Sequence, residues 1–134
     1  MSQKKSVDYS LITRHYILQK DLNAGGSLYG GVMLSWLDEA GYILASELAG
    51  CTNMATVALH NVQFKAPARL GDLIEIYGKL VRIGKTSITV NIMAETYSVV
   101  QNIRMSIIEC EIVFVKIDGN GKPTEINQDR RVII

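Results

Sequence analysis

The sequence is poor in several features that would assign it to a specialised class of protein. Its net charge is only +1, from 14 basic and 13 acidic residues, so no excess of one sign favours nucleic acid or an anionic membrane surface as a partner. The longest apolar stretch carries Asp38, Glu39 and Glu47, which argues against a membrane span. Residues 1–9 are polar and contain no apolar segment typical of a secretory signal. We therefore expect a cytoplasmic protein with no nucleic-acid partner and no membrane contact.

Cysteine and histidine are scarce as well, which limits the chemistry available to the chain. The 2 cysteines, Cys51 and Cys110, lack metal-ligand spacing and cannot form a disulfide framework, so we expect both to be reduced and structural. The 2 histidines, His15 and His60, have no catalytic partner nearby in the sequence. Isolated strand histidines are more often structural than catalytic. We expect no metal site from these residues.

Length and hydrophobic content indicate one globular domain. The chain has 134 residues, of which 48% are hydrophobic, enough for one well-filled core. We expect a single domain over residues 1–134, with loosely held segments at residues 1–10 and 124–134.

The central feature is a glycine-rich loop, residues 23–31, that leads into a long helical pattern. Residues 32–48 contain no proline, and Gly50 follows as a helix stop signal. At about 100° per residue, one side of this helix is polar and the other sides are apolar, so the helix must be largely buried. A buried carboxylate is costly unless it is paired or used in chemistry. The polar side carries Ser35, Asp38, Glu39, Tyr42 and Ser46.

The rest of the chain has strand patterns. Segments rich in β-branched and apolar residues predict strands at residues 13–22, 55–64, 73–83, 87–97 and 103–117. Short turns separate most of them, which implies an antiparallel sheet. Only one helix is available to cover the apolar face of this sheet, so the sheet must curl around it. The predicted fold is α+β, with the hotdog architecture, and its uncovered edges favour dimers or larger assemblies.

Three features of the loop and helix are candidates for a catalytic site. The amides of Gly30 and Gly31 can approach a ligand closely at the helix N-terminus, where the helix dipole favours an acceptor oxygen. Asp38 could act as a base or a nucleophile, and Asn23 could orient a water or a carbonyl. Within one chain Asn23 and Asp38 are far apart, but across a dimer axis they could meet. Such a site would suit acyl transfer to water.

Each candidate also has an ordinary structural explanation. The glycine loop could be a connector or a cap, and Asp38 could be solvated or hydrogen-bonded within the domain. Several residues could bind phosphate, although an ordinary hairpin with solvated basic residues is the more frequent arrangement. These residues are Lys65, Arg69, Arg82 and the hairpin Gly84, Lys85, Thr86 and Ser87.

The pattern resembles one known family. Asn23-Ala24, Gly26, Gly30-Gly31 and Asp38, followed by Phe64, Pro67, Gly71-Asp72 and the 84–87 hairpin, are similar to the hotdog-fold acyl-CoA thioesterases, in particular the compact single-domain bacterial acyl-CoA hydrolases. The similarity covers about residues 12–123.

The resemblance implies hydrolysis of acyl-CoA to free coenzyme A and a carboxylic acid, without a metal or cofactor. It implies that Asn23 and Asp38 meet across a homodimer, that the Gly30 and Gly31 amides polarise the thioester carbonyl, and that coenzyme A lies between subunits. It also implies a trimer of dimers.

The sequence departs from the family pattern at two positions. Gly25 replaces a common asparagine, and Ala66 replaces a common arginine that contacts phosphate, a role that Lys65 or Arg69 would then have to take. Dehydratases of the same fold rely on a histidine in the site, and neither histidine of this chain lies in the loop or helix.

The alternative function is a non-catalytic acyl-CoA-binding or sensing module. The sequence leaves open whether Asp38 activates water or attacks the thioester to form an anhydride.

Overall fold

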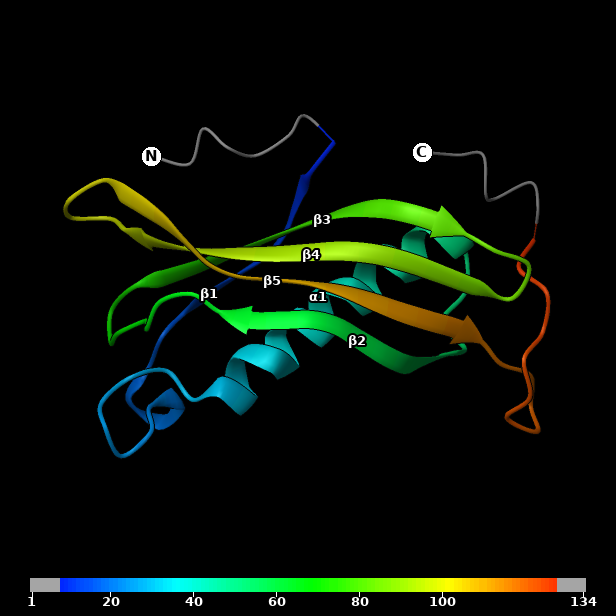
Figure 1. The fold of residues 1–134 in the computed structure, drawn as a ribbon, viewed down its shortest axis with the longest axis horizontal. Coiled ribbons are helices and arrows are strands. Elements are labelled where there is room, and N and C mark those ends of the chain that lie inside the picture. The colour runs from blue at the N-terminus through cyan, green and yellow to red at the C-terminus, as the bar shows by residue number, and fades with distance from the viewer. Residues whose placement is uncertain (1–7, 128–134) are drawn as a thin grey trace.

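The computed structural model describes residues 8–127, which fold into one long helix and one five-stranded sheet (Figure 1). Neighbouring strands are antiparallel throughout, and their order is β1-β3-β4-β5-β2. The predicted α+β hotdog architecture is therefore confirmed. The elements are β1 (Ser10–Tyr16), the short 3-10 helix η1 (Gln19–Asp21), α1 (Gly30–Ala49), β2 (Met54–Phe64), β3 (Leu73–Ile83), β4 (Ser87–Ser98) and β5 (Ile103–Lys116).

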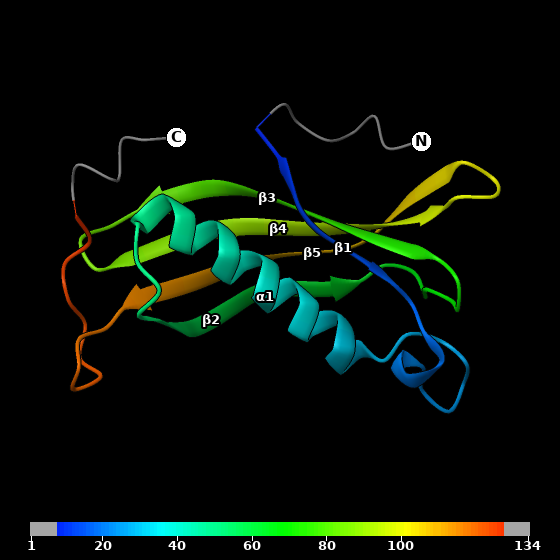
Figure 2. The same ribbon diagram turned by 180° about the vertical axis from the view of Figure 1, so that it is seen from behind.

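Small residues let α1 lie close to the sheet. The helix follows the glycine-rich loop and ends at Gly50, which adopts the left-handed conformation with φ of 70°. Its buried face includes Ala40, Gly41 and Ala45. A Cβ atom on Gly41 would lie 3.1 Å from the Phe114 ring, so this position has no room for a side chain without movement of the ring. Figure 2 shows α1 crossing the concave face of the sheet.

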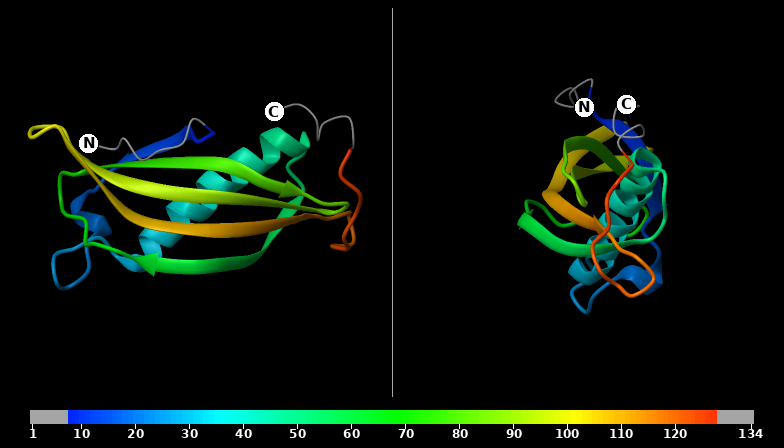
Figure 3. Two further views of the ribbon diagram at one scale, coloured as in Figure 1. Left: turned by 45° about the horizontal axis from the view of Figure 1, so that its top comes forward. Right: turned by 90° about the vertical axis from the view of Figure 1, so that its right-hand side faces the viewer.

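The core lies between α1 and the inward faces of the central strands. Alternate residues of β4 and β5, including Ile88, Ile92, Ile112 and Phe114, are fully buried, which agrees with the period of two in a half-buried strand. Figure 3 shows the sheet curving around the helix. The apolar face of the helix and the concave face of the sheet thus bury each other.

The two ends of the described chain differ from the sequence prediction. The first strand ends at Tyr16 because the Asp21 carboxylate accepts a hydrogen bond from the Leu18 N–H at 2.9 Å, which closes a turn before the glycine loop. At the other end, Ile126 is fully buried and its N–H bonds to the Lys85 carbonyl at 2.9 Å. Ile126 is therefore packed rather than loosely held, although Glu125 and Asn127 beside it are exposed, and residues 1–7 and 128–134 lie outside the described part.

The edge strand β2 is irregular. Within residues 8–127, no strand pairs with its outer edge. Its pairing with β5 shifts between His60 and Gln63, where an additional residue forms a bulge. Asn61, in this bulge, has a φ of 59°, a conformation that asparagine tolerates better than most residues. After the bulge, Phe64 pairs with the buried Ile108 and so lies on the helix side of the sheet.

Candidate active site

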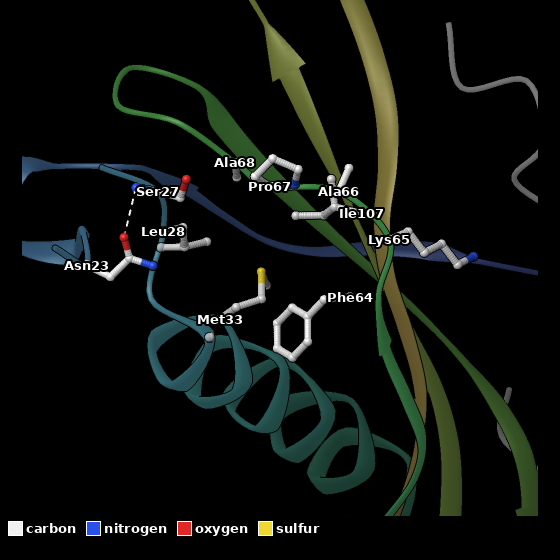
Figure 4. Close-up of a pocket in the computed structure, with 11 residues that line it drawn as sticks. Asn23, Ser27, Leu28, Met33, Phe64, Lys65, Ala66, Pro67, Ala68 and Ile107 are labelled. Atoms are coloured by element: carbon white, nitrogen blue, oxygen red, sulfur yellow. Dashed lines mark hydrogen bonds between the residues drawn. The ribbon is translucent and has the colours of Figure 1, made fainter. Parts of the chain in front are cut away.

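The glycine-rich loop is organised by Asn23. Its side-chain oxygen Oδ1 accepts hydrogen bonds from the N–H groups of Gly25 at 2.9 Å and Ser27 at 3.1 Å. Its own N–H donates to the Ser27 carbonyl at 2.7 Å, and Gly26 has a φ of 84° that glycine adopts without strain. Asn23 thus holds the loop closed on itself, and Figure 4 shows its side-chain nitrogen on the side of the loop nearer Leu28 and Met33.

The first turn of α1 presents backbone donors without an acceptor inside the helix. Tyr29 is the N-cap residue, and its side chain makes no capping hydrogen bond. Gly30 and Gly31 are the first helical residues, so their N–H groups have no carbonyl four residues earlier within the helix. Together with the helix dipole, these donors favour a partly negative oxygen at this end of α1.

A cavity of about 420 Å³ adjoins this helix end. It lies between the glycine loop, the first turn of α1, the end of β2 and the segment that follows β2 (Figure 4). Most of its side chains are apolar. The lining residues are Asn23, Ser27, Leu28, Gly30, Met33, Phe64, Lys65, Ala66, Pro67, Ala68 and Ile107. The cavity therefore combines an apolar interior with polar groups at one side, as ligand pockets commonly do.

Asp38 lies outside this cavity. Its carboxylate oxygen Oδ1 accepts a hydrogen bond from the Thr56 hydroxyl at 2.8 Å, which ties the middle of α1 to the edge strand β2. The side chain is half-buried rather than fully enclosed. Within one chain the structure therefore does not bring Asn23 and Asp38 into one pocket.

Thr56 is a residue that the sequence reasoning missed. Its partner is 18 positions away in the chain and on another element. The available signal was the strand period: Thr56 shares a face with Met54, which is buried, and so its hydroxyl points toward the helix.

A buried thiol lies near the same carboxylate. Burial raises the pKa of Cys110 to about 11, and the negative charges of Glu109 and Asp38 add to the effect. Cys110 is 2% exposed, and a thiol with this pKa stays protonated near neutral pH. Cys110 and Cys51 are both free cysteines, and their structural role stays a prediction.

The residues predicted to bind phosphate are dispersed in a single chain. The Lys65 side chain points away from the cavity (Figure 4), and its Nζ lies 3.9 Å from Glu109 Oε1. Arg69 forms a backbone bridge with Ser27 and so lies beside the glycine loop. The 84–87 hairpin follows β3, whose first residue pairs with Tyr16 near the loop, so this hairpin lies at the far end of the sheet.

The two histidines have structural surroundings. The His15 ring stacks on Trp36 with ring centres 4.4 Å apart, and its Nε2 lies 3.4 Å from Glu39 Oε1. His60 is exposed on β2 and pairs in register with Glu111. Neither ring lines the cavity beside α1.

Within residues 8–127, no group of three or more histidine, cysteine, aspartate and glutamate side chains is arranged to hold a metal ion. In the same part of the chain, no helix combines the length and hydropathy that crossing a membrane requires.

The chain is similar to known thioesterases in sequence and in structure. The model of the thioesterase superfamily matches residues 25–103. An acyl-CoA thioester hydrolase of Salmonella typhimurium is 33% identical over 116 residues, which cover 84% of this chain and 86% of that protein. The hexameric hotdog-fold thioesterase of Campylobacter jejuni superposes with a TM-score of 0.84 at 29% identity, covering 92% of this chain and 94% of that one. A hexameric thioesterase from Yersinia pestis gives a TM-score of 0.83 at 30% identity, covering 89% and 96%.

Proposed function

Because this chain belongs to the thioesterase superfamily, we propose that it hydrolyses acyl-CoA thioesters to coenzyme A and a carboxylic acid. The observation that carries the proposal is the uncapped first turn of α1, which opens beside Asn23 onto an apolar cavity. Hydrolysis of a thioester passes through a tetrahedral intermediate whose oxyanion needs preorganised donors. The N–H groups of Gly30 and Gly31 are such donors.

The proposed active site needs two protomers. Asp38 is attached through Thr56 to β2, whose outer edge is open within the described residues. Open strand edges are natural sites for pairing with a second copy. If β2 pairs antiparallel with itself over its full length, Met54 lies opposite Phe64 of the partner subunit, and Thr56 follows two residues later. The Asp38–Thr56 pair of one protomer then approaches the cavity of the other.

The same symmetry accounts for the scattered phosphate-binding candidates. An antiparallel pair reverses one protomer relative to the other, so the far end of one sheet lies near the glycine loop of its neighbour. We therefore propose that Arg69 and Lys65 of one protomer, together with Gly84, Lys85, Thr86 and Ser87 of a neighbouring one, hold the coenzyme A phosphates. Because the similar thioesterases from Campylobacter jejuni and Yersinia pestis are hexameric, we propose a trimer of such dimers.

Asp38 can serve hydrolysis in two ways. As a general base it takes a proton from water while the water oxygen attacks the thioester carbonyl, and it returns that proton to the departing thiolate. As a nucleophile it attacks the carbonyl itself and expels the thiolate, and water then cleaves the resulting anhydride to restore the carboxylate. In both routes the hydrogen bond from Thr56 fixes one carboxylate oxygen and leaves the other to react. Water is the only co-substrate that the proposal requires, with no metal or cofactor.

The release of free thiol from a panel of acyl-CoAs tests this function. We expect turnover by the wild-type protein and loss of turnover, with retained substrate binding, for Asp38→Ala. Asp38→Asn is the matched variant, because it keeps the shape of the side chain but removes its basicity. Undiminished turnover in both variants would exclude the role given to Asp38.

Mixed dimers test the trans arrangement. Neither Asn23→Ala nor Asp38→Ala homodimers should turn over substrate well, but dimers that contain one protomer of each retain one intact site. Recovery of up to half of the wild-type activity per mixed dimer is expected. If mixed dimers assemble and remain inactive, the two residues do not act across the interface.

The alternative function, an acyl-CoA-binding or sensing module without catalysis, predicts a different result from the same assays. The protein would bind acyl-CoA with Asp38 intact and release no thiol from any member of the panel. The half-buried Asp38–Thr56 pair favours catalysis, because an aspartate beside an uncharged alcohol is held in place without having its charge neutralised.

A further inference from the structure

We propose that Phe64 sets the size of the acyl group that the cavity beside α1 accepts, and that this group is an uncharged hydrocarbon chain. The inference rests on the proposed thioesterase function, because it assigns one end of that substrate to one part of the site. Three features carry it: the lining of the cavity, the direction of the Lys65 side chain and the position of the Phe64 ring.

The cavity suits the hydrocarbon end of the substrate better than the coenzyme end. The nucleotide and pantetheine parts of coenzyme A carry phosphates and amides, which need charged or hydrogen-bonding partners when they leave water. The Asn23 side-chain oxygen is already used by two backbone N–H groups of the loop. The Lys65 ammonium lies near Glu109, outside the cavity. Apart from the Asn23 amide nitrogen and the Ser27 hydroxyl, which both belong to the glycine loop, the other lining side chains, such as Leu28, Met33 and Ile107, offer apolar contact alone.

Phe64 is the lining residue that can be substituted without disturbing the packed core of the protomer. Met33 is 1% exposed and Ile107 is 3% exposed, so both belong to the packed interior. In a single protomer the Phe64 side chain is 54% exposed although it lies on the helix side of the sheet, and in the proposed dimer it also lies at the interface between the two β2 strands. It therefore lines the cavity from the mouth rather than from the core (Figure 4).

The ring stands directly against the first turn of α1. A Cβ atom on Gly30 would lie 3.4 Å from the Phe64 Cζ atom, which is van der Waals contact. An acyl chain whose carbonyl oxygen meets the Gly30 amide must therefore pass beside this ring. The ring thus limits the width of the passage between the reacting carbonyl and the apolar interior.

The charge of the lining gives the second part of the inference. An acyl group that ends in a carboxylate would bury a negative charge, and no cationic side chain among the lining residues faces the interior. Straight-chain saturated acyl groups meet no such cost. We therefore expect the protein to prefer neutral acyl-CoAs over acyl-CoAs of dicarboxylic acids with the same number of carbons.

The test compares chain-length profiles of wild type, Phe64→Ala and Ala66→Leu. Profiles are measured twice: as kcat/KM for a homologous series of saturated acyl-CoAs, and as the Kd of the same series for protein carrying Asp38→Ala. Burial of one methylene changes affinity about fourfold, so removal of a phenyl ring should move the ratio of long-chain to short-chain kcat/KM by about tenfold or more toward long chains. Ala66→Leu adds volume from the opposite wall and should move the ratio toward short chains. Leu11→Ala, which removes a side chain that is 48% exposed on β1, is the matched control and should leave the profile unchanged.

The outcomes separate this inference from the proposed function. Profiles of both variants that superimpose on the wild-type profile, in turnover and in binding, would overturn the assignment of Phe64. A shifted binding profile together with no turnover by any form would uphold the assignment and reject the thioesterase function. Equal affinity for neutral and dicarboxylic acyl-CoAs would overturn the uncharged-chain assignment. If Phe64→Ala does not fold, Phe64→Leu makes a smaller change in the same direction and is judged by the same profile.

Discussion

Replacement of Thr56 by valine isolates the contribution of one hydroxyl group to the proposed reaction. Valine has nearly the shape of threonine and lacks only the donor that reaches Asp38 Oδ1 at 2.8 Å. A hydrogen bond to an ionised group contributes about 1.5–3 kcal/mol, and the half-buried position of this pair favours the lower part of that range. If the hydroxyl fixes the carboxylate for reaction, its loss should lower kcat about tenfold to a hundredfold.

The assay is steady-state thiol release, which separates kcat from KM. We expect KM to change little, because Thr56 does not line the cavity that receives the acyl group. Thr56→Ser keeps the hydroxyl and is the matched control, with kcat expected near the wild-type value. Thr56→Val should also add no further loss to the Asp38→Ala variant, since the hydroxyl acts through that carboxylate.

Two results would refute the reasoning. Thr56→Val with kcat within twofold of wild type would mean that the hydrogen bond does not position the reacting group. Thr56→Ser with the same loss as Thr56→Val would mean that the methyl packing, and not the hydroxyl, is responsible. Thermal unfolding of both variants distinguishes a local effect from loss of fold.

Three further predictions concern stability, each measured by thermal or urea unfolding. Gly41→Ala should destabilise the protein by about 1–3 kcal/mol, because the new Cβ lies 3.1 Å from the Phe114 ring in a packed core. Asn61→Gly should stabilise it slightly and Asn61→Val should destabilise it by about 1–2 kcal/mol, because the φ of 59° suits glycine and strains valine. Asp21→Asn should cost about 1 kcal/mol at neutral pH, because an amide oxygen replaces a charged acceptor for the Leu18 N–H.

The Asp21 prediction has a definite pH dependence. The hydrogen bond from the Leu18 N–H holds the pKa of the Asp21 carboxyl below its ordinary value of 3.8. A lowered folded-state pKa contributes stability that is complete above the unfolded-state pKa and is lost as the pH falls through the folded-state value. The stability gap between wild type and Asp21→Asn should therefore close in acid. A stability gap that widens in acid would contradict this assignment. The Gly41 prediction would be wrong if Gly41→Ala stabilised the protein. The Asn61 prediction would be wrong if Asn61→Val left the stability unchanged.

The fold was predictable because its strongest signals are local. The apolar surface of residues 32–48 and the stop signal at Gly50 predict the helix. The observed helix, Gly30–Ala49, is longer by two residues at its start and by one at its end. The predicted strand at residues 73–83 agrees with β3 in both bounds, since turn residues flank it on each side. The first strand was predicted to end too late because its end depends on a hydrogen bond from the Leu18 N–H to the Asp21 carboxylate, which no periodicity reveals.

The candidate site was less accessible to sequence reasoning because its contacts are distant along the chain. Asp38 could be singled out as a carboxylate on a buried helix, but its partner Thr56 depends on how α1 lies against β2. The cavity forms from three separate parts of the chain, namely residues 23–33, residues 64–68 and Ile107 of β5. The packing of Ile126 was missed for the same reason, since one isoleucine in a polar tail carries no periodic signal.

The irregular pairing of β2 decides which chemical character faces the cavity. Between His60 and Gln63 the strand advances three residues while β5 advances two, from Glu111 to Glu109. The same sequence paired with β5 residue for residue, without the bulge, would turn Phe64 outward and Lys65 inward, so an ammonium group would stand where the aromatic ring now lies. Deletion of one bulge residue would not have this effect, because both strands would then advance two residues between these pairs and Phe64 would stay opposite Ile108. The bulge therefore absorbs one residue that regular pairing could not accommodate, and by doing so it keeps the apolar side chain, and not its cationic neighbour, at the cavity.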